Sequence, residues 1–189
     1  GMTMKLDARQ ALRQRLGGDR RATRGEIEKL VLYAAGQPEI TVSDVEACTG
    51  DVSADSADQA VDAALAGDGA LADRRLQKAF DAGTNPQTVL LALQRQMQAI
   101  ESLRRAVDHA GASPASAVAS ARPPVFFARR RIIEDAVSAW TGDGARRALD
   151  RLQTTILDSR RRAELAEALT RQALLGIAAE TARARRGRR

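Results

Sequence analysis

Apolar residues recur at helical spacing through most of the chain, interrupted by short stretches of glycine, proline and small polar residues. The longest such pattern predicts one helix from residue 86 to about residue 110. Its apolar face consists of Val89, Leu93, Met97, Ile100 and Val107. Asn85 can cap this helix, Pro86 suits its first position, and Gly111 can end it.

The same periodicity predicts further helices on both sides of this one. After it, the pattern predicts a short helix following Ser113-Pro114 and longer ones at about 125–140, 145–157 and 163–182; before it, helices at 57–66 and 70–82. In the 125–140 helix the inward positions are Ile133, Ala136, Val137 and Trp140. Nearer the start, Leu6, Leu12 and Leu16 mark a first short helix, residues 27–34 a second and residues 42–48 a third.

Local signals predict where the short helices begin and end. Gly17 after Leu16 suits a helix stop, because glycine tolerates the left-handed backbone found there. Thr23-x-x-Glu26 and Ser43-x-x-Glu46 have the spacing of capping boxes, so we expect helices to start at these points. Ile27, Leu30, Val31 and Ala34 then form one apolar face.

Composition favours an all-α fold. Aromatic residues are only 3% of the 189 residues although 44% are hydrophobic, and no run shows the period-two, β-branched pattern of a strand. The polar segment 50–57 resembles a linker. We therefore predict a small three-helix domain over residues 1–50 and a helical bundle over residues 51–189.

The net charge of +6 is concentrated at the end of the chain. The terminal stretch 183–189 holds Arg183, Arg185, Arg186, Arg188 and Arg189, and the remaining 184 residues carry 25 basic and 24 acidic groups. This basic tail is interpreted as a frayed, solvated end after the last apolar turn, or alternatively as a nonspecific contact to DNA phosphates. Arginine outnumbers lysine 27 to 3 throughout, which weakens any local argument from arginine.

The sequence gives no support for catalysis. The phosphate-binding pattern G-x-x-x-x-G-K-[ST] is absent, as are G-x-S-x-G, H-E-x-x-H and C-x-x-C. With one cysteine, Cys48, and one histidine, His109, we expect no catalytic residues, cofactor or metal. No apolar run approaches ~18 residues, so we expect no membrane span, and a single cysteine fits a cytoplasmic location.

The segment 122–131 is the candidate interaction element, because two of the three phenylalanines and several arginines gather there behind a Pro-Pro pair. The helix at 86–110 also has more leucines than one core-facing stripe requires. The predicted partner-binding residues are Leu90, Leu91, Leu103, Arg122, Phe126, Phe127 and Arg130. The alternative is that the phenylalanines simply anchor the segment to the bundle.

Several segments, in order and spacing, resemble a known family. They are Leu16-Gly17-Gly18-Asp19-Arg20, residues 26–33 (EIEKLVLY), residues 40–46, residues 86–95 and Arg122-Pro123-Pro124-Val125-Phe126-Phe127. They are similar to the lid and collar regions of the delta subunit of the bacterial DNA polymerase III clamp loader. The resemblance covers roughly residues 10 to 180.

The resemblance implies an AAA+ lid-like domain at residues 1–50 and a collar at residues 51–189. It implies a non-catalytic role in DNA replication, with the clamp-loader ATPase (gamma/tau) and delta-prime subunits as partners in a five-member ring. In that family an N-terminal nucleotide-fold domain binds and opens the sliding clamp. No alternating strand–helix pattern precedes the lid here, so we interpret the chain as a truncated or shortened relative and expect no contact with the clamp.

The competing hypothesis is a stand-alone helical DNA-binding or regulatory module. It would use residues 24–48 as a degenerate helix-turn-helix. Its recognition helix, residues 44–48, would be short and acidic, which suits a phosphate-lined groove poorly.

Overall fold

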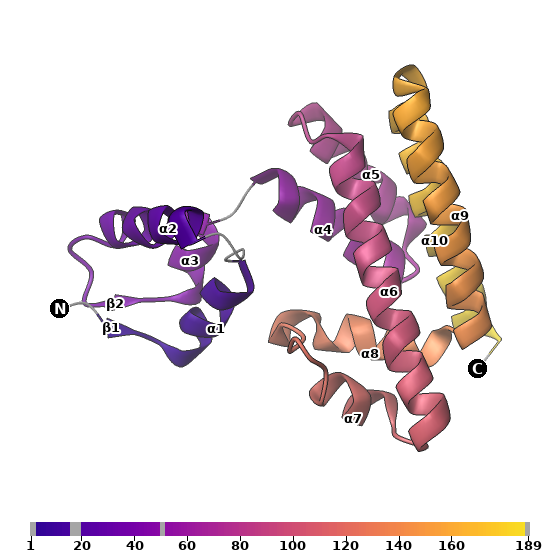
Figure 1. Ribbon diagram of the computed structural model, residues 1–189, viewed down its shortest axis with the longest axis horizontal. Coiled ribbons are helices and arrows are strands. Elements are labelled where there is room, and N and C mark those ends of the chain that lie inside the picture. Colours follow the sequence, from indigo (N-terminus) through magenta and orange to yellow (C-terminus); the bar gives the residue numbers. More distant parts are fainter. Residues whose placement is uncertain (1–2, 16–19, 50–51, 188–189) are drawn as a thin grey trace. The chain divides into compact units, whose positions relative to one another are not determined.

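The computed structural model describes residues 3–15, 20–49 and 52–187, which form two compact units, Gly1–Val52 and Ser53–Arg189 (Figure 1). Both units are built from helices, which confirms the all-α prediction. The domain boundary predicted between residues 50 and 51 lies outside the described residues, as does the helix stop predicted at Gly17.

The first unit contains helices α1 (Leu6–Arg15), α2 (Arg20–Tyr33) and α3 (Val42–Thr49). Two-residue strands that the sequence did not predict, β1 (Thr3–Met4) and β2 (Glu39–Ile40), pair in parallel. Helix α3 contacts both α1 and α2. The buried apolar residues of this unit are Ala8, Ala11, Leu12, Leu30, Ala34, Ile40 and Val45.

Both predicted capping boxes of the first unit are wrong. Helix α2 begins at Arg20, so Thr23 lies inside it. Helix α3 begins one residue before Ser43 and is capped by Thr41, whose amide donates to Asp44 at 2.8 Å while the Asp44 amide approaches the Thr41 hydroxyl at 3.4 Å. The hydrogen bonds from the Thr41 amide and hydroxyl lower the pKa of Asp44.

Helix α2 buries a narrower face than its sequence predicts. Leu30 and Ala34 are buried, but Ile27 and Val31 are about two-fifths exposed, at 40% and 44%. The core of this small unit therefore covers only part of the apolar face predicted for α2.

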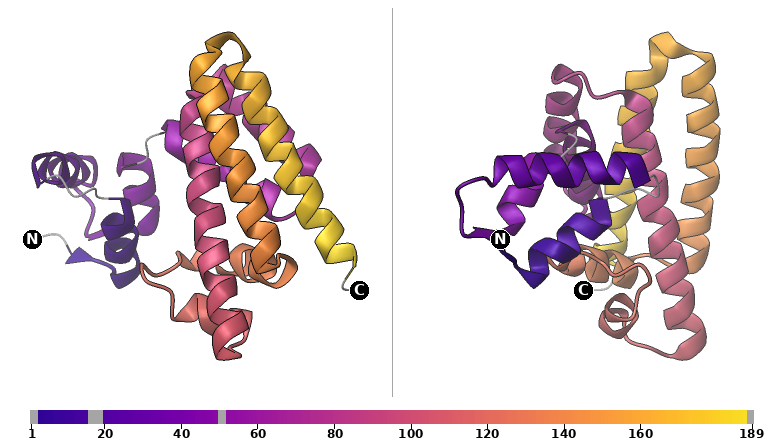
Figure 2. Two further views of the ribbon diagram at one scale, coloured as in Figure 1. Left: turned by 45° about the vertical axis from the view of Figure 1, so that its right-hand side comes forward. Right: turned by 60° about the vertical axis from the view of Figure 1, so that its left-hand side comes forward.

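The second unit is a helical bundle around one long helix. Its elements are α4 (Val52–Leu65), α5 (Gly69–Asp81), α6 (Pro86–Ala110), α7 (Pro114–Ala119), the 3₁₀ turn η1 (Phe127–Arg129), α8 (Arg130–Ala139), α9 (Gly142–Arg161), the 3₁₀ turn η2 (Ala163–Leu165) and α10 (Ala166–Arg186). Helices α6, α9 and α10 lie side by side, and α7 and α8 lie at the end of the bundle where α6 ends (Figures 1 and 2).

The structure confirms the predicted start and end of helix α6. The Asn85 side chain accepts a hydrogen bond from the Gln87 amide at 2.8 Å, and Gly111 closes the helix with φ +62°. All five residues of its predicted stripe are buried. The four inward residues predicted for 125–140 are buried as well.

Other boundaries differ from the sequence prediction. Helix α8 begins at Arg130 rather than at Val125, because residues 127–129 form a 3₁₀ turn. Thr141 caps α9 through the Gly144 amide, which starts that helix at Gly142. Helix α10 continues through Arg186, so the basic stretch from residue 183 begins as helix and not as a frayed tail.

Helix α10 closes the bundle against the turn between α4 and α5. Gly67 ends α4 with φ +79°, and a Cβ there would lie 3.1 Å from the Ala182 backbone nitrogen. The Arg185 guanidinium donates to the Ala66 carbonyl oxygen and to the Asp135 carboxylate. These contacts join α10 to α4 and to α8.

Trp140 makes a buried polar contact between the junction of α8 and α9 and helix α10. Its indole nitrogen donates to the Thr181 hydroxyl at 3.0 Å, and that hydroxyl donates to the Ile177 carbonyl at 2.9 Å. Both side chains are almost fully buried, so the indole N–H has no access to water.

Replacing Thr181 with valine should therefore lower the free energy of unfolding by about 1–3 kcal/mol, because the buried indole N–H loses its acceptor. The measurement is denaturant unfolding followed by tryptophan fluorescence. Thr154→Val is the matched control, since the Thr154 hydroxyl bonds only its own helix and is exposed. Equal stability of the two variants would contradict the prediction.

Candidate protein-interaction surfaces

The predicted partner-binding leucines of α6 divide between core and surface. Leu90 is fully buried, so its prediction as a partner contact is wrong: α6 is covered on this side by the bundle itself. Leu103 is half-buried and packs against the core. Only Leu91, 46% exposed, is available to a partner.

In the segment 122–131 one phenylalanine side chain is exposed and the other is half-buried. Phe127 is 58% exposed, whereas Phe126 is half-buried, and the two ring centroids are 4.6 Å apart with the rings tilted by 57°. Arg122 is exposed and donates to the Ala121 carbonyl at 3.0 Å, and Arg130 is exposed. Phe127, Arg122 and Arg130 are therefore open to a partner.

Arg129 has a different role from its neighbours, because it ties η1 to α4. Its Nε atom donates to Asp62 at 3.0 Å, and its NH1 atom lies 3.7 Å from the Asp58 carboxylate. Burial raises the pKa of Asp62, and Arg129 opposes that rise. The ion pair attaches the 122–131 segment to α4 and thereby fixes the position of Phe127, which lies two residues before Arg129.

The predicted DNA-binding arginines are also divided. Arg183 and Arg186 are exposed on α10, while Arg185 is bound to Asp135 and Ala66. Arg188 and Arg189 lie outside the described residues. Arg185 is thus committed to the bundle, and Arg183 and Arg186 remain open to phosphate.

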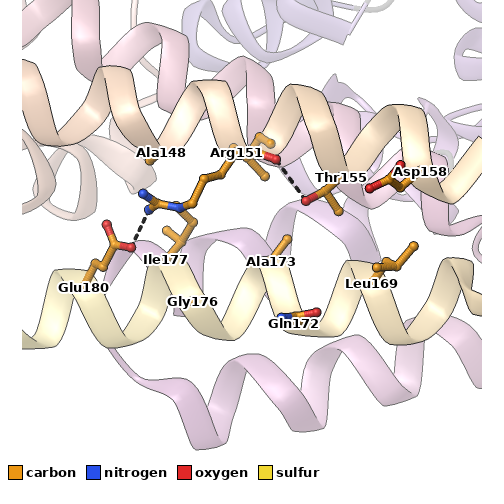
Figure 3. A pocket seen from close by; sticks show the side chains of 11 residues that line it. Ala148, Arg151, Thr155, Asp158, Leu169, Gln172, Ala173, Gly176, Ile177 and Glu180 are labelled. Atoms are coloured by element: carbon orange, nitrogen blue, oxygen red, sulfur yellow. Dashed lines mark hydrogen bonds and ion pairs between the residues drawn. The ribbon is translucent and has the colours of Figure 1, made fainter.

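A groove of about 370 Å³, which the sequence did not predict, runs between α9 and α10 (Figure 3). Its lining is Ala148, Arg151, Leu152, Thr155 and Asp158 from α9, and Leu169, Gln172, Ala173, Gly176, Ile177 and Glu180 from α10. The two helices run antiparallel, so Asp158 lies across from Leu169 and Ala148 lies near Ile177.

Charge is distributed unevenly along this groove. At one end Arg151 forms an ion pair with Glu180 across the two helices. At the other end Asp158 is half-buried and has no ion pair or hydrogen bond to its carboxylate among the described residues. The hydroxyl of Thr155 donates to the Arg151 carbonyl at 2.9 Å, within its own helix. The Asp158 carboxylate is thus unpaired among the described residues, although the exposed Arg161 and Arg162 follow it at i+3 and i+4.

Gly176 lies in the middle of α10 and of the groove. A glycine inside a helix is less favourable than alanine by about 0.8–1.0 kcal/mol, so a packing reason is usually found for it. The described residues give no such reason, because a Cβ at Gly176 would meet none of their atoms within 4 Å. A lone glycine within the apolar period 163–182 was the sequence signal that could have pointed to this surface.

Two other hollows each contain an ion pair in their lining. One, of about 550 Å³, contains Asp135 and Arg185; the other, of about 300 Å³, contains Glu101 and Arg105. The Arg105 guanidinium has a raised pKa because it binds the Glu101 carboxylate. Among the described residues, no three acidic, histidine or cysteine side chains are grouped to hold a metal ion. In the same residues no helix is long and apolar enough to cross a membrane.

Comparison with protein-family models gives no match, and neither does comparison with curated proteins. Among solved structures, the chain is similar to the DNA clamp loader delta protein (YqeN) of Bacillus subtilis, with a TM-score of 0.60 and 16% sequence identity. The similarity covers 93% of this chain and 52% of that one, so the chain spans about half the length of its structural neighbour. The fold of this chain is thus clamp-loader-like.

The three consecutive arginines at 129–131 should differ sharply on substitution. Arg129→Ala should lower the free energy of unfolding by about 1–3 kcal/mol, because it leaves the largely buried Asp62 carboxylate without its partner. Arg130→Ala and Arg131→Ala, both at exposed positions, should stay within about 0.5 kcal/mol of wild type. Thermal and urea unfolding measure both; a similar loss in all three variants would contradict the assigned role of Arg129.

Proposed function

We propose that this chain is a non-catalytic component of a bacterial clamp loader, similar to the delta subunit, and that it assembles with the ATPase (gamma/tau) and delta-prime subunits in DNA replication. The observation that carries the proposal is the likeness of fold to a clamp loader delta protein over 93% of the chain. That likeness extends through both compact units, so it does not rest on one common helical motif.

The surfaces of the second unit support a role in assembly. A member of a ring with head-to-tail contacts needs two different faces, one for each neighbour. Phe127 belongs to η1, which Arg129 ties to α4, whereas the groove is lined by α9 and α10 alone. The two candidate surfaces could therefore be occupied at the same time.

In this proposal, contact with DNA is less important than contact with the other subunits. Arg183 and Arg186 are exposed, and contacts from them and from the arginines beyond would be electrostatic and insensitive to base sequence. The proposed role is cytoplasmic and needs no cofactor. Contact with the sliding clamp is not part of the proposal.

The test of assembly uses an exposed and a buried residue in parallel. Phe127→Ser should weaken binding to the ATPase and delta-prime subunits by about tenfold or more, the scale of an interface hot spot, while leaving the melting temperature near that of wild type. Leu90→Ala should instead lower the melting temperature, because it opens a cavity in the core. Pull-down and thermal unfolding are measured on the same preparations.

Two outcomes would count against assembly. If the wild-type chain binds neither subunit, the proposed assembly is wrong. If Phe127→Ser loses binding only in proportion to its loss of stability, Phe127 is not an interface residue.

Nucleotide binding provides a further check on the non-catalytic assignment. The sequence has no phosphate-binding loop, so isothermal calorimetry with ATP and magnesium should show no saturable binding at micromolar concentrations. The clamp-loader ATPase subunit is the positive control. Saturable binding of ATP by the isolated chain would contradict the assignment.

A further inference from the structure

We propose that the cluster of Arg129, Asp62 and Asp58 is a proton-sensitive latch, which fixes η1 and the position of Phe127 while Asp62 is ionised and releases them when Asp62 is protonated. The inference concerns a conformational device within the second unit. It does not depend on the proposed function, because the latch acts whether or not Phe127 binds another subunit.

One guanidinium in this cluster serves two carboxylates. Asp58 and Asp62 lie one turn apart on α4; Arg129 donates to Asp62 from its Nε atom at 3.0 Å, and its NH1 atom lies 3.7 Å from Asp58. The Asp62 and Arg129 side chains are only 15% and 21% exposed, whereas that of Asp58 is 33% exposed. Asp62 is therefore the closer and better buried partner, and Asp58 alone would hold Arg129 weakly.

The segment that leads to the latch is irregular. Residues 121–126 contain no helix or strand, and η1 is a single 3₁₀ turn without a side-chain cap. The elements on either side are anchored independently, since Val118 of α7 and Ile133 of α8 are buried in the core. Loss of the Arg129 contact should therefore let η1 move while α7 and α8 keep their places.

The surroundings of Asp62 favour its protonation. Burial raises the pKa of Asp62; Arg129 opposes the rise, Asp58 on the same helix adds to it, and Arg75 of α5 opposes it. Arg95 of α6 lies 3.4 Å from Asp58 and so engages that second carboxylate. Because the net effect is a raised pKa, Asp62 takes up a proton at a higher pH than an ordinary aspartate does. The neutral acid no longer attracts the Arg129 guanidinium by its charge.

Protonation of Asp62 should open the latch without unfolding the bundle. A carboxyl group whose pKa is raised by folding favours the native state more as the pH falls through that pKa, because burying the neutral acid costs less than burying the carboxylate. Titration of Asp62 therefore does not drive acid unfolding. The loss of its contact with Arg129 is a local event at η1.

Fluorine NMR of the full-length chain labelled with fluorinated phenylalanine can follow this event, because the chain has only three phenylalanines, Phe80, Phe126 and Phe127. On titration from about pH 7.5 to about pH 4, a range that reaches the ordinary aspartate pKa, the Phe127 signal should narrow and move toward its position in the unfolded chain. The signal of Phe80, in α5, should stay unchanged. The Phe127→Leu variant identifies the Phe127 signal, and circular dichroism checks that the helices persist.

Two variants test the assignment to Asp62. Asp62→Asn has the neutral charge of the protonated acid, so it should show the released Phe127 signal at neutral pH and respond no further to acid. Trypsin at neutral pH should cleave it after residues 129–131 about tenfold faster than the wild type. Asp73→Asn is the matched control and should behave as wild type, because Asp73 pairs with Arg171 elsewhere in the bundle.

Three results would overturn the proposal. A wild-type Phe127 signal in Asp62→Asn at neutral pH would mean that η1 is held without the charge of Asp62. A Phe127 transition that persists in Asp62→Asn at the wild-type midpoint would mean that another group titrates. Loss of helical circular dichroism together with the Phe127 transition would mean that acid unfolds the whole unit.

Discussion

Burial of one face of α6 is the interaction on which the second unit depends. This single helix contacts α7, α8, α9 and α10, so its apolar stripe is the surface against which the other elements find their positions. With few aromatic side chains available, the core is made of leucine, valine, isoleucine and many alanines. Small side chains allow helices to pack at short distances, and the stability comes from the number of such contacts more than from any one of them.

Long-range ion pairs then fix how the outer elements sit on this core. Arg129 binds α4, Arg171 joins α10 to Asp73 of α5, and Arg185 joins α10 to α8. Each is a planar guanidinium reaching a partner at least 50 residues away, a geometry that arginine holds better than lysine. The Arg129–Asp62 pair is largely buried and adds to stability, whereas the more exposed pairs of Arg171 and Arg185 contribute little free energy. Their effect here is positional, and it gives Phe127 a defined place on the surface.

In the second unit the sequence predicted the features that depend on local signals, whereas both capping boxes predicted in the first unit were wrong. The start and end of α6 follow from Asn85-Pro86 and Gly111, and the buried faces of α6 and α8 follow from helical periodicity. The exposure of Ile27 could not be predicted, because it depends on how far a small core extends. The same limit applies to the surfaces: Arg129 differs from Arg130 only through Asp62, 67 residues earlier, and the groove exists only because α9 and α10 pack together.

The contact of Gly67 with Ala182 has a consequence for how the protein is made. The turn after α4 leaves the ribosome early, but the backbone that covers it is synthesised about 115 residues later, together with Arg185. At the usual rate of synthesis this delay is roughly 6 to 23 s. Throughout that interval the surfaces that α10 covers, including the turn at Gly67, lack their cover. The second unit therefore cannot complete its core until α10 has been made, however fast its individual helices form.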